Sequence, residues 1–242
     1  MIGIQDINVH QILSMSDLVQ TFLNEEFTAQ SVLPTELDEY LANGWRHFGT
    51  HFFRYNLGIY NDEIRRVIPL RIRIAEFSLT KSQSRVLRKN ADLGCEIRPI
   101  KITAEVEELF ERHRLRFKQH PPDSLHTFLS TEPAMTPCDA FELAVYDRDR
   151  LVATSFFDAG CSALSGVYAV FEPEKSHRSL GIFTMLKEIE FAIDGGKEFY
   201  YQGYCYSGES FYDYKKRFRG TEVFDWNGKW ERLSPQILRP MQ

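Results

Sequence analysis

Two tyrosines and a lysine late in the chain form the clearest group of candidate proton donors and acceptors. Tyr204 ends an aromatic segment that reads as a buried strand, and Tyr214 and Lys215 follow it. Phenol and ammonium groups donate hydrogen bonds, and an amine whose charge is disfavoured can also accept a proton. Tyr204, Tyr214 and Lys215 are therefore candidate catalytic residues for stabilising developing charge or relaying a proton, although Tyr214 could equally be a packed aromatic and Lys215 a solvated charge.

A second charged group surrounds Lys215. Lys216, Arg217 and Arg219 follow it among aromatic side chains, and Glu209 precedes it. Cations bind phosphate while aromatic rings stack on unpaired bases, so this composition favours a site for a single-stranded nucleic acid end. Glu209 is a candidate contact for an amino group.

A third, basic group lies earlier in the chain. Apolar residues alternate with Arg71 and Arg73, which predicts a half-exposed strand with a basic face. A helix from Thr80 to Asn90 should follow. We expect strand and helix to form one basic surface that binds carboxylate or phosphate, with these cations: Arg71, Lys81, Arg85 and Arg88.

Other reaction classes lack their usual residues. The seven histidines show no metal-ligand or nucleophile arrangement, and no Gly-x-Ser-x-Gly, P-loop or Rossmann fingerprint is present. The cysteines are widely spaced, which predicts reduced thiols: Cys95, Cys138, Cys161 and Cys205. These observations argue against hydrolases, NTPases and dehydrogenases.

Composition indicates a folded protein. The chain has 242 residues, 43% of them apolar and 14% aromatic. Its net charge of -5 means that any contact with nucleic acid must use a local basic patch. No long apolar run or basic leader is seen, so we expect a cytoplasmic protein without membrane spans.

The expected elements alternate between strands and helices. They are a helix from Pro34 to Gly44 capped by Thr35, a hairpin turning at 49–50, a strand over 95–100, a helix over 103–119, a hairpin over 141–157, a strand over 165–171, a helix over 178–192 with Ile193 on its inner side, a strand over 199–204, a short helix at 214–215 and a hairpin at 227–228. This order predicts an α+β fold with a lobe over residues 1–100 and a second over 101–242.

The second lobe resembles a known fold. Three antiparallel strands, a helix opened by Arg and Gly, and another strand are the core order of GNAT acyltransferases. The resemblance implies two lobes built as tandem GNAT-like halves. It also implies that amides at the start of the helix bind a phosphate-bearing donor, which makes Arg178, Ser179 and Gly181 candidates. Phe183 replaces the last small residue of the GNAT signature, which disfavours acyl-CoA.

Three passages carry a more specific resemblance. They are GWRHFG at 44–49, PLRI at 69–72 with SQSRVLRKNADL at 82–93, and LSGVY at 164–168 through RSLG at 178–181 to YKKRFR at 214–219. In order and spacing over about residues 35–232, they resemble the arginyl-tRNA-protein transferase family, including its bacterial leucyl-transferring branch. The string GESF at 208–211 is also similar to GESM of leucyl/phenylalanyl-tRNA-protein transferases.

The resemblance implies an enzyme that moves Arg or Leu from an aminoacyl-tRNA to the N-terminal amine of a polypeptide, one that begins with Asp or Glu. The acidic acceptor would be bound by the basic group: Arg71, Lys81, Ser82, Gln83, Arg85 and Arg88. The aminoacyl-tRNA would be bound by the later group: Arg178, Ser179, Gly181, Glu209, Lys216, Arg217 and Arg219. The energy for transfer already lies in the ester, so no cofactor is expected.

One departure from the family concerns metal. The family carries clustered cysteines just before the PLRI strand, where this chain has residues 57–64 without a cysteine. We therefore expect neither zinc nor an iron-sulfur cluster. Separately, we expect a monomer. Two alternatives stay open: a GNAT N-acyltransferase that uses acyl-CoA, and a non-catalytic tRNA- or degron-binding homologue.

Overall fold

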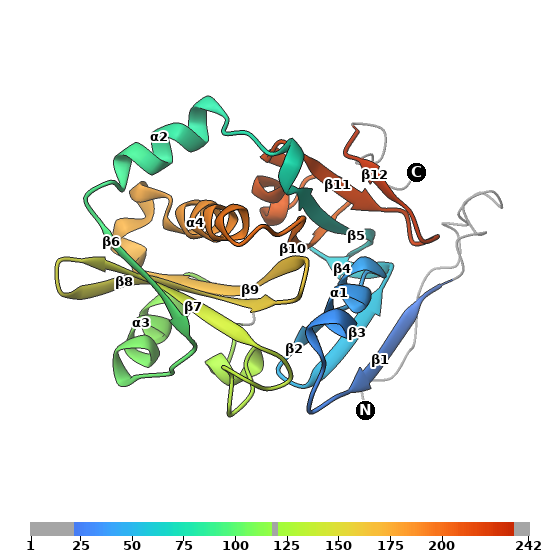
Figure 1. The fold of residues 1–242 in the computed structure, drawn as a ribbon, viewed down its shortest axis with the longest axis horizontal. Coiled ribbons are helices and arrows are strands. Elements are labelled where there is room, and N and C mark those ends of the chain that lie inside the picture. The colour runs from blue at the N-terminus through green and yellow to red at the C-terminus, as the bar shows by residue number, and fades with distance from the viewer. Residues whose placement is uncertain (1–21, 118–120, 235–242) are drawn as a thin grey trace.

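The computed structural model describes residues 22–117 and 121–234, and its strands form two sheets (Figure 1). The smaller sheet has the order β1-β3-β2, with β1 (Asn24–Thr28), β2 (Arg46–Phe48) and β3 (His51–Tyr55). The larger sheet has nine strands in the order β12-β11-β5-β10-β9-β8-β7-β6, with β4 paired to β5. The α+β expectation is therefore confirmed.

Strands of the larger sheet are distributed along the chain between residues 57 and 232. They are β4 (Leu57–Tyr60), β5 (Glu63–Arg73), β6 (Gly94–Pro99), β7 (Ala140–Asp147), β8 (Arg150–Ala159), β9 (Ala163–Phe171), β10 (Phe199–Tyr206), β11 (Thr221–Phe224) and β12 (Trp230–Arg232). Strands β9 and β10 pair in parallel, whereas the other described pairs are antiparallel.

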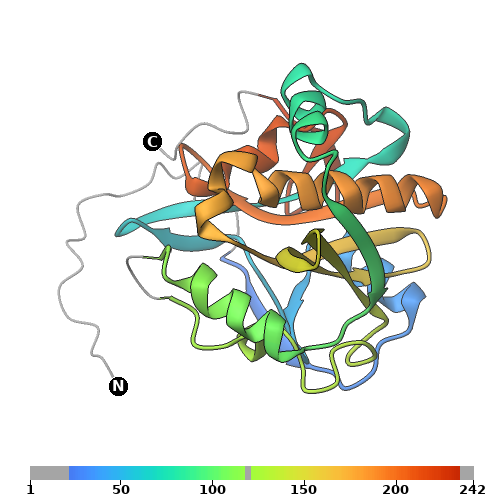
Figure 2. The ribbon, with the colours of Figure 1, turned by 90° about the vertical axis from the view of Figure 1, so that its left-hand side faces the viewer.

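Two helices cover opposite faces of this sheet (Figure 2). Helix α4 (Leu180–Asp194) connects β9 to β10, as a parallel pair requires. Helix α3 (Ala104–Arg114) packs on the other face, against β8 and β9. Successive side chains of a strand point to opposite faces of the sheet and so enter different cores. In β7, Leu143 lies in the core under α4 and Ala144 in the core under α3.

The remaining helices lie outside the two main layers or connect strands. They are α1 (Pro34–Ala42), α2 (Lys81–Lys89) and the short 3₁₀ helices η1 (Ile74–Glu76), η2 (Leu125–Thr127), η3 (Pro173–Arg178) and η4 (Phe211–Arg217). Helix α1 packs with the smaller sheet in a third core, and α2 packs against α4. No helix in the described residues is long and apolar enough to cross a membrane.

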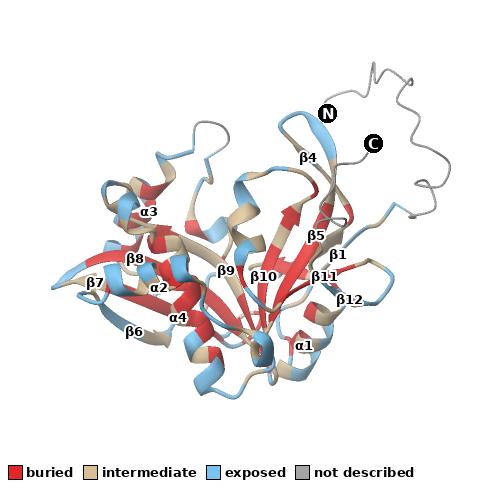
Figure 3. Ribbon diagram, turned by 90° about the horizontal axis from the view of Figure 1, so that it is seen from above, coloured by how far each residue is buried: buried red, intermediate tan, exposed pale blue. Residues whose placement is uncertain are grey.

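The sequence predicted that the strand with Arg71 and Arg73 is half-exposed, and this prediction is wrong for β5. Strand β5 is buried from Val67 to Ile72, as its red colour in Figure 3 shows. It lies between β10 and β11, so neither edge faces solvent. Arg71 is 7% exposed and pairs with Glu222 on β11 at 2.7 Å. The alternation of apolar and basic residues therefore did not show which side chains are exposed. Arg71 is buried, and its ion pair with Glu222 takes the place of contact with water.

Three boundary details also differ from expectation. Leu33, not Thr35, caps α1, and its backbone amide donates to Glu36 at 2.8 Å. Helix α3 ends at Arg114, earlier than predicted. Ile193, expected on the inner side, is 48% exposed and lies in the last turn of α4, which ends at Asp194.

Candidate active site

The central feature is the point where β9 and β10 separate. They pair at Phe199 with Ala163, Tyr200 with Leu164 and Tyr201 with Ser165, and no further. Just beyond this point, the pairing of β10 with β5 and the pairing of β9 with β8 each shift by one residue, as in a β-bulge. Residues 163–165 are buried, whereas residues 166–169 are partly exposed. Figure 3 shows the two strands fanning apart from this point.

Gly203 occupies the bulge of β10 with a backbone φ of +84°. This conformation suits glycine, which lacks a side chain that would clash. A side-chain carbon on Gly203 would lie 3.3 Å from Lys215 Nζ and 3.7 Å from both Arg46 Nε and Arg46 Nη2. Two cationic side chains therefore converge on one point, next to the separation of the strands.

Lys215 extends from η4 to this point. Its Nζ donates to the Tyr204 carbonyl at 3.2 Å and lies 5.2 Å from the centre of the Tyr212 ring. Among the described residues, no carboxylate lies within ion-pair distance of Lys215. Burial, and then the nearby Arg46 charge, lower the pKa of Lys215 to about 8. Lys215 can therefore act as an acid or a base near neutral pH.

Arg46 reaches the same point from β2. It is 8% exposed, and its Nη1 donates to Ser165 Oγ at 2.7 Å while its Nη2 donates to the Gly166 carbonyl. These are the residues at which β9 leaves β10. Burial lowers the pKa of Arg46, and the charge of Asp158 opposes this shift.

The two predicted catalytic tyrosines lie in the same region. Tyr204 donates its hydroxyl to the Gly44 carbonyl at 2.6 Å, and burial raises its pKa. Burial also raises the pKa of Tyr214 to about 12. Both phenols therefore keep their protons at neutral pH and can act only as hydrogen-bond donors or acceptors.

A buried carboxyl lies behind the separation point. Glu188 on α4 accepts hydrogen bonds from Ser155 and, at 2.5 Å, from the Tyr200 hydroxyl. Burial raises its pKa to about 7, although the two hydrogen bonds oppose this shift. The Tyr200 hydroxyl would lie 2.8 Å from a side-chain carbon on Gly166, so this strand position accommodates only glycine without movement.

The predicted donor-binding residues fall into two places. Arg178 and Ser179 precede α4, and Gly181 lies in its first turn. Arg178 makes paired hydrogen bonds to Asp92, at 2.8 and 2.9 Å. Because this pair neutralises Arg178, contact with a phosphate there would have to use the backbone amides at the start of α4.

The other donor-binding candidates surround η4. Lys216 is internally satisfied, because it donates to the Tyr206 and Gly208 carbonyls at 2.8 and 2.9 Å and pairs with Asp213. Glu209 and Arg217 are exposed. Arg219 donates to Ser78 Oγ at 3.2 Å, which ties the segment before α2 to the end of η4.

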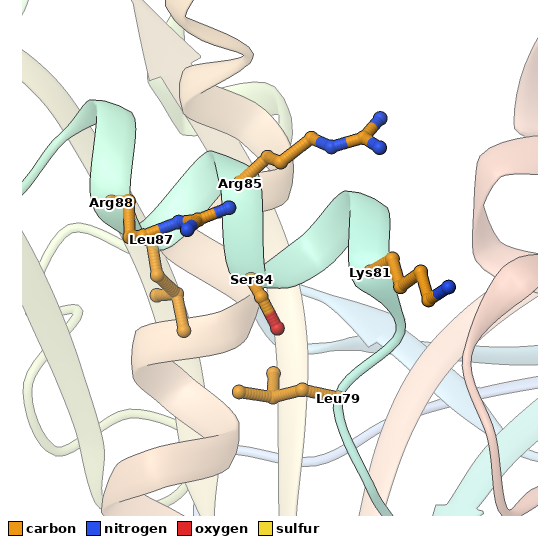
Figure 4. Close-up of a pocket in the computed structure, with 6 residues that line it drawn as sticks. All are labelled: Leu79, Lys81, Ser84, Arg85, Leu87 and Arg88. Atoms are coloured by element: carbon orange, nitrogen blue, oxygen red, sulfur yellow. The ribbon is translucent and has the colours of Figure 1, made fainter.

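The predicted acceptor-binding residues are divided by the fold. Arg71 is buried with Glu222 and does not reach the surface of α2. Gln83 forms the capping box of α2 with Thr80, and Ser82 is exposed beside it. An open groove of about 490 Å³ lies along this helix (Figure 4), lined by Leu79, Lys81, Ser84, Arg85, Leu87 and Arg88.

Two groups at the site were missed by sequence reasoning. Arg46 was seen only as part of a motif, although an arginine inside an aromatic hairpin is an unusual buried charge. Tyr60, Tyr206 and Tyr212 form a tyrosine cluster with ring centres 5.0 to 6.5 Å apart. The cluster holds the loop before η4, because the amide of Phe211 donates to the Tyr60 hydroxyl at 2.8 Å.

Comparison with known proteins gives the family. A family model described as "Arginine-tRNA-protein transferase, C terminus" matches residues 105–225, about half of the chain. An "Aspartate/glutamate leucyltransferase" of Marinobacter nauticus is 32% identical over 198 residues, which cover 80% of each protein. The chain belongs to the arginine-tRNA-protein transferase family. It is therefore an aminoacyltransferase, as the sequence predicted.

Other similarities of this transferase agree with that assignment. An "Aspartate/glutamate leucyltransferase" of Saccharophagus degradans is 28% identical over 220 residues, covering 88% of this chain and 89% of that protein. Among solved structures, FemX has a TM-score of 0.50 at 13% identity, and the match covers 90% of this chain and 73% of FemX. The last comparison concerns the fold alone.

The residues of this transferase do not fit the cysteine-bound metal that the family resemblance implied. Residues 57–64 form β4 and the start of β5 and contain no thiol. His47, Cys138 and Asp158 come close together, but both nitrogens of His47 have oxygen partners, Gly49 O at 2.9 Å and Asp158 at 3.0 Å. Burial and the Asp158 charge raise the pKa of Cys138, which disfavours the thiolate that binds metal.

We therefore expect transfer activity to be independent of zinc and iron. Protein purified anaerobically without a metal-binding tag should contain neither metal in stoichiometric amount, and prolonged exposure to a chelator should leave its rate unchanged. Elemental analysis and activity on the same samples check this. Stoichiometric zinc or iron that is lost together with activity would contradict the prediction.

Proposed function

We propose that this protein transfers leucine or arginine from an aminoacyl-tRNA to the N-terminal amine of a polypeptide that begins with Asp or Glu. The observation that carries the proposal is the convergence of Lys215 and Arg46 on Gly203 where β9 and β10 separate. The relatives named aspartate/glutamate leucyltransferase support leucine as the donor and an acidic acceptor.

The reaction replaces an ester by an amide. The acceptor amine attacks the ester carbonyl, a C–N bond forms, and the bond from the carbonyl carbon to the ribose oxygen breaks. The attacking nitrogen must lose a proton, and the ribose oxygen must gain one. Neutral Lys215 takes the proton from the nitrogen and can return it to the ribose oxygen, so the step needs no other reactant.

Exposed aromatic residues in the first turn of η4 suit the end of the tRNA. Phe211 and Tyr212 are 61% and 37% exposed, and they lie close to Lys215 in sequence and space. Unpaired bases stack on such rings, while Arg217 and Arg219 supply charge for phosphate. Glu209 lies at the same loop and is assigned to the amino group of the donor residue.

The groove along α2 suits the acidic acceptor. Lys81, Arg85 and Arg88 are exposed cations with no ion pair to another described residue, while Leu79 and Leu87 provide apolar contact. The segment that leads into the groove is joined to the chain after η4, because Arg219 donates to Ser78. We assign the Asp or Glu side chain of the acceptor to this groove and its N-terminal amine to Lys215.

The wider description of the protein belongs to the same proposal. We assign it a GNAT-like fold with lobes over residues 1–100 and 101–242, a monomeric state and a cytoplasmic location. The separation of two parallel strands beside a connecting helix, with the likeness to FemX, supports the fold assignment.

A transfer assay tests the proposal. Purified protein is incubated with tRNA charged with labelled Leu, Arg or Phe, or with labelled acetyl-CoA, and with peptides that differ only in a first residue of Asp, Glu or Lys. We expect label from Leu-tRNA or Arg-tRNA on the Asp and Glu peptides. Label only from acetyl-CoA would establish the acyl-CoA alternative, and label from neither donor, with tRNA bound, would establish the binding module.

Arg85 should determine much of the preference for acidic acceptors. Replacing it with Ala removes a charge-assisted contact worth about 2 kcal/mol, which is about 30-fold in kcat/KM for Asp peptides. The measurement is kcat/KM for Asp and Lys peptides in both proteins. Lys101→Ala, which removes an exposed cation outside the groove, serves as control. An unchanged Asp/Lys ratio in Arg85→Ala would show that Arg85 does not bind the acceptor.

A further inference from the structure

Arg46 has hydrogen-bonding capacity that its structural contacts do not use. A guanidinium carries five N–H donors, and the bonds to Ser165 and Gly166 use two of them. Arg46 is buried, and among the described residues it has no carboxylate within ion-pair distance. A buried guanidinium without such a partner is costly unless an anion occupies the position during function.

The unused donors face a defined point. Nε and Nη2 each lie 3.7 Å from the position that a side-chain carbon of Gly203 would take, and Lys215 Nζ lies 3.3 Å from it. Small movements would bring an oxygen atom placed near this point within hydrogen-bond distance of Arg46. Gly203 places no side chain between Arg46 and Lys215, so an oxygen atom in contact with its Cα would lie between the two cations.

The electrostatic setting matches a transient negative charge. Arg46 is fixed by Ser165 and Gly166, so its donors are oriented before substrate arrives. Such preorganised donors stabilise charge in a buried site without reorganisation at the moment of reaction. The charge of Asp158 on β8 acts on Arg46 from beyond ion-pair distance, because Asp158 bonds to His47 instead.

We propose that Arg46 is a catalytic residue that binds the carbonyl oxygen of the aminoacyl ester as that oxygen becomes an oxyanion in the space beside Gly203. This inference rests on the proposed transfer reaction. When the C–N bond forms, the carbonyl electron pair moves onto oxygen, where Arg46 donates to it. When the bond to ribose breaks, the pair returns to the carbonyl, and Lys215 handles the proton of the attacking amine.

Two variants and two ligands test this role. Arg46→Lys keeps a positive charge but loses the planar set of donors, and Gly203→Ala fills the space with a methyl group. The ligands are aminoacyl-adenosine analogues, one with a 3′-amide in place of the ester and one with a tetrahedral anionic phosphonate. For each protein we would measure kcat, the Kd of both ligands and the melting temperature.

We expect Arg46→Lys to lower kcat by about 10²- to 10³-fold, the usual effect of removing one oxyanion donor. The Kd of the amide should change little, and the melting temperature should stay near that of the wild type. In the wild type the phosphonate should bind at least about 100-fold more tightly than the amide, and Arg46→Lys should remove most of that difference. Gly203→Ala should weaken phosphonate binding more than amide binding.

Three outcomes would overturn the proposal. Unchanged kcat in Arg46→Lys would show that Arg46 is not needed for catalysis. If Arg46→Lys lowers kcat and amide affinity by the same factor and also lowers the melting temperature, Arg46 only holds β9 in place. If neither variant folds, equal binding of the two ligands by the wild type decides against an oxyanion site. Absence of transfer by the wild type would instead reject the proposed function.

Discussion

Replacing Lys215 with Met should lower kcat by about 10³-fold, within the range for loss of a general acid-base group. The physical reason is its position at Gly203 with one carbonyl partner and no described ion pair, which leaves its amine available to the substrate. The Kd of the 3′-amide analogue should change much less than kcat, because Met preserves most of the side-chain volume. Steady-state kinetics and equilibrium binding on the same preparation check both statements.

Lys197→Met is the matched control. Lys197 precedes β10 and, like Lys215, donates to backbone carbonyls, those of Gly160 and Cys161 at 2.6 and 3.0 Å. It lies at the paired end of β9 and β10, away from their separation. We expect it to retain wild-type kcat. A Lys215→Met protein that folds and keeps more than about a tenth of wild-type kcat would exclude Lys215 as the principal base.

The rate should also rise with pH through the titration of Lys215. Burial and the Arg46 charge favour the neutral amine and set its pKa at about 8. The base is therefore mostly protonated below that pH and mostly neutral above it. At saturating substrate, kcat should rise about 100-fold between about pH 6 and pH 9, with a midpoint near 8 and a plateau beyond it.

The acceptor amine titrates in the same range, with a pKa of about 7.7 to 8. The two contributions separate if a second acceptor carries a less basic N-terminal amine. The wild-type midpoint should remain near 8 with both acceptors, and Lys215→Met should lose this dependence with the less basic acceptor. A wild-type midpoint that follows the acceptor would assign the titration to the substrate.

Elements defined by local signals were predicted well from the sequence. The cap at Thr80 and the end at Asn90 gave the limits of α2, since capping depends on residues three or four positions apart. The helix over 103–119 was also predicted, and Val106, Leu109 and Phe110, which are spaced as on one face of a helix, are all buried in α3. In both helices, the local preference and the tertiary packing favour the same structure.

Features that depend on distant partners were not predicted. Arg71 looked solvent-exposed because alternation was the available signal, whereas Glu222 lies far away in the chain. Arg46 is separated from Ser165 by 119 residues, so no spacing rule could connect them. Tyr214 and Lys215 could be singled out because they follow a recognisable buried strand, but the approach of Lys215 to Gly203 depends on the bulge in β10.

The position of β5 between β10 and β11 has a consequence for how the enzyme is made. As the chain leaves the ribosome, β5 emerges long before β10 and β11. Its pairing with those two strands is therefore incomplete until residues 199–224 have been made. Long-range strand pairing of this kind is slow and leaves hydrophobic surface exposed meanwhile. Arg46, Gly203 and Lys215 come together only after that pairing. An unfinished chain thus lacks the proposed site, and we expect it not to use the charged tRNA that its own synthesis requires.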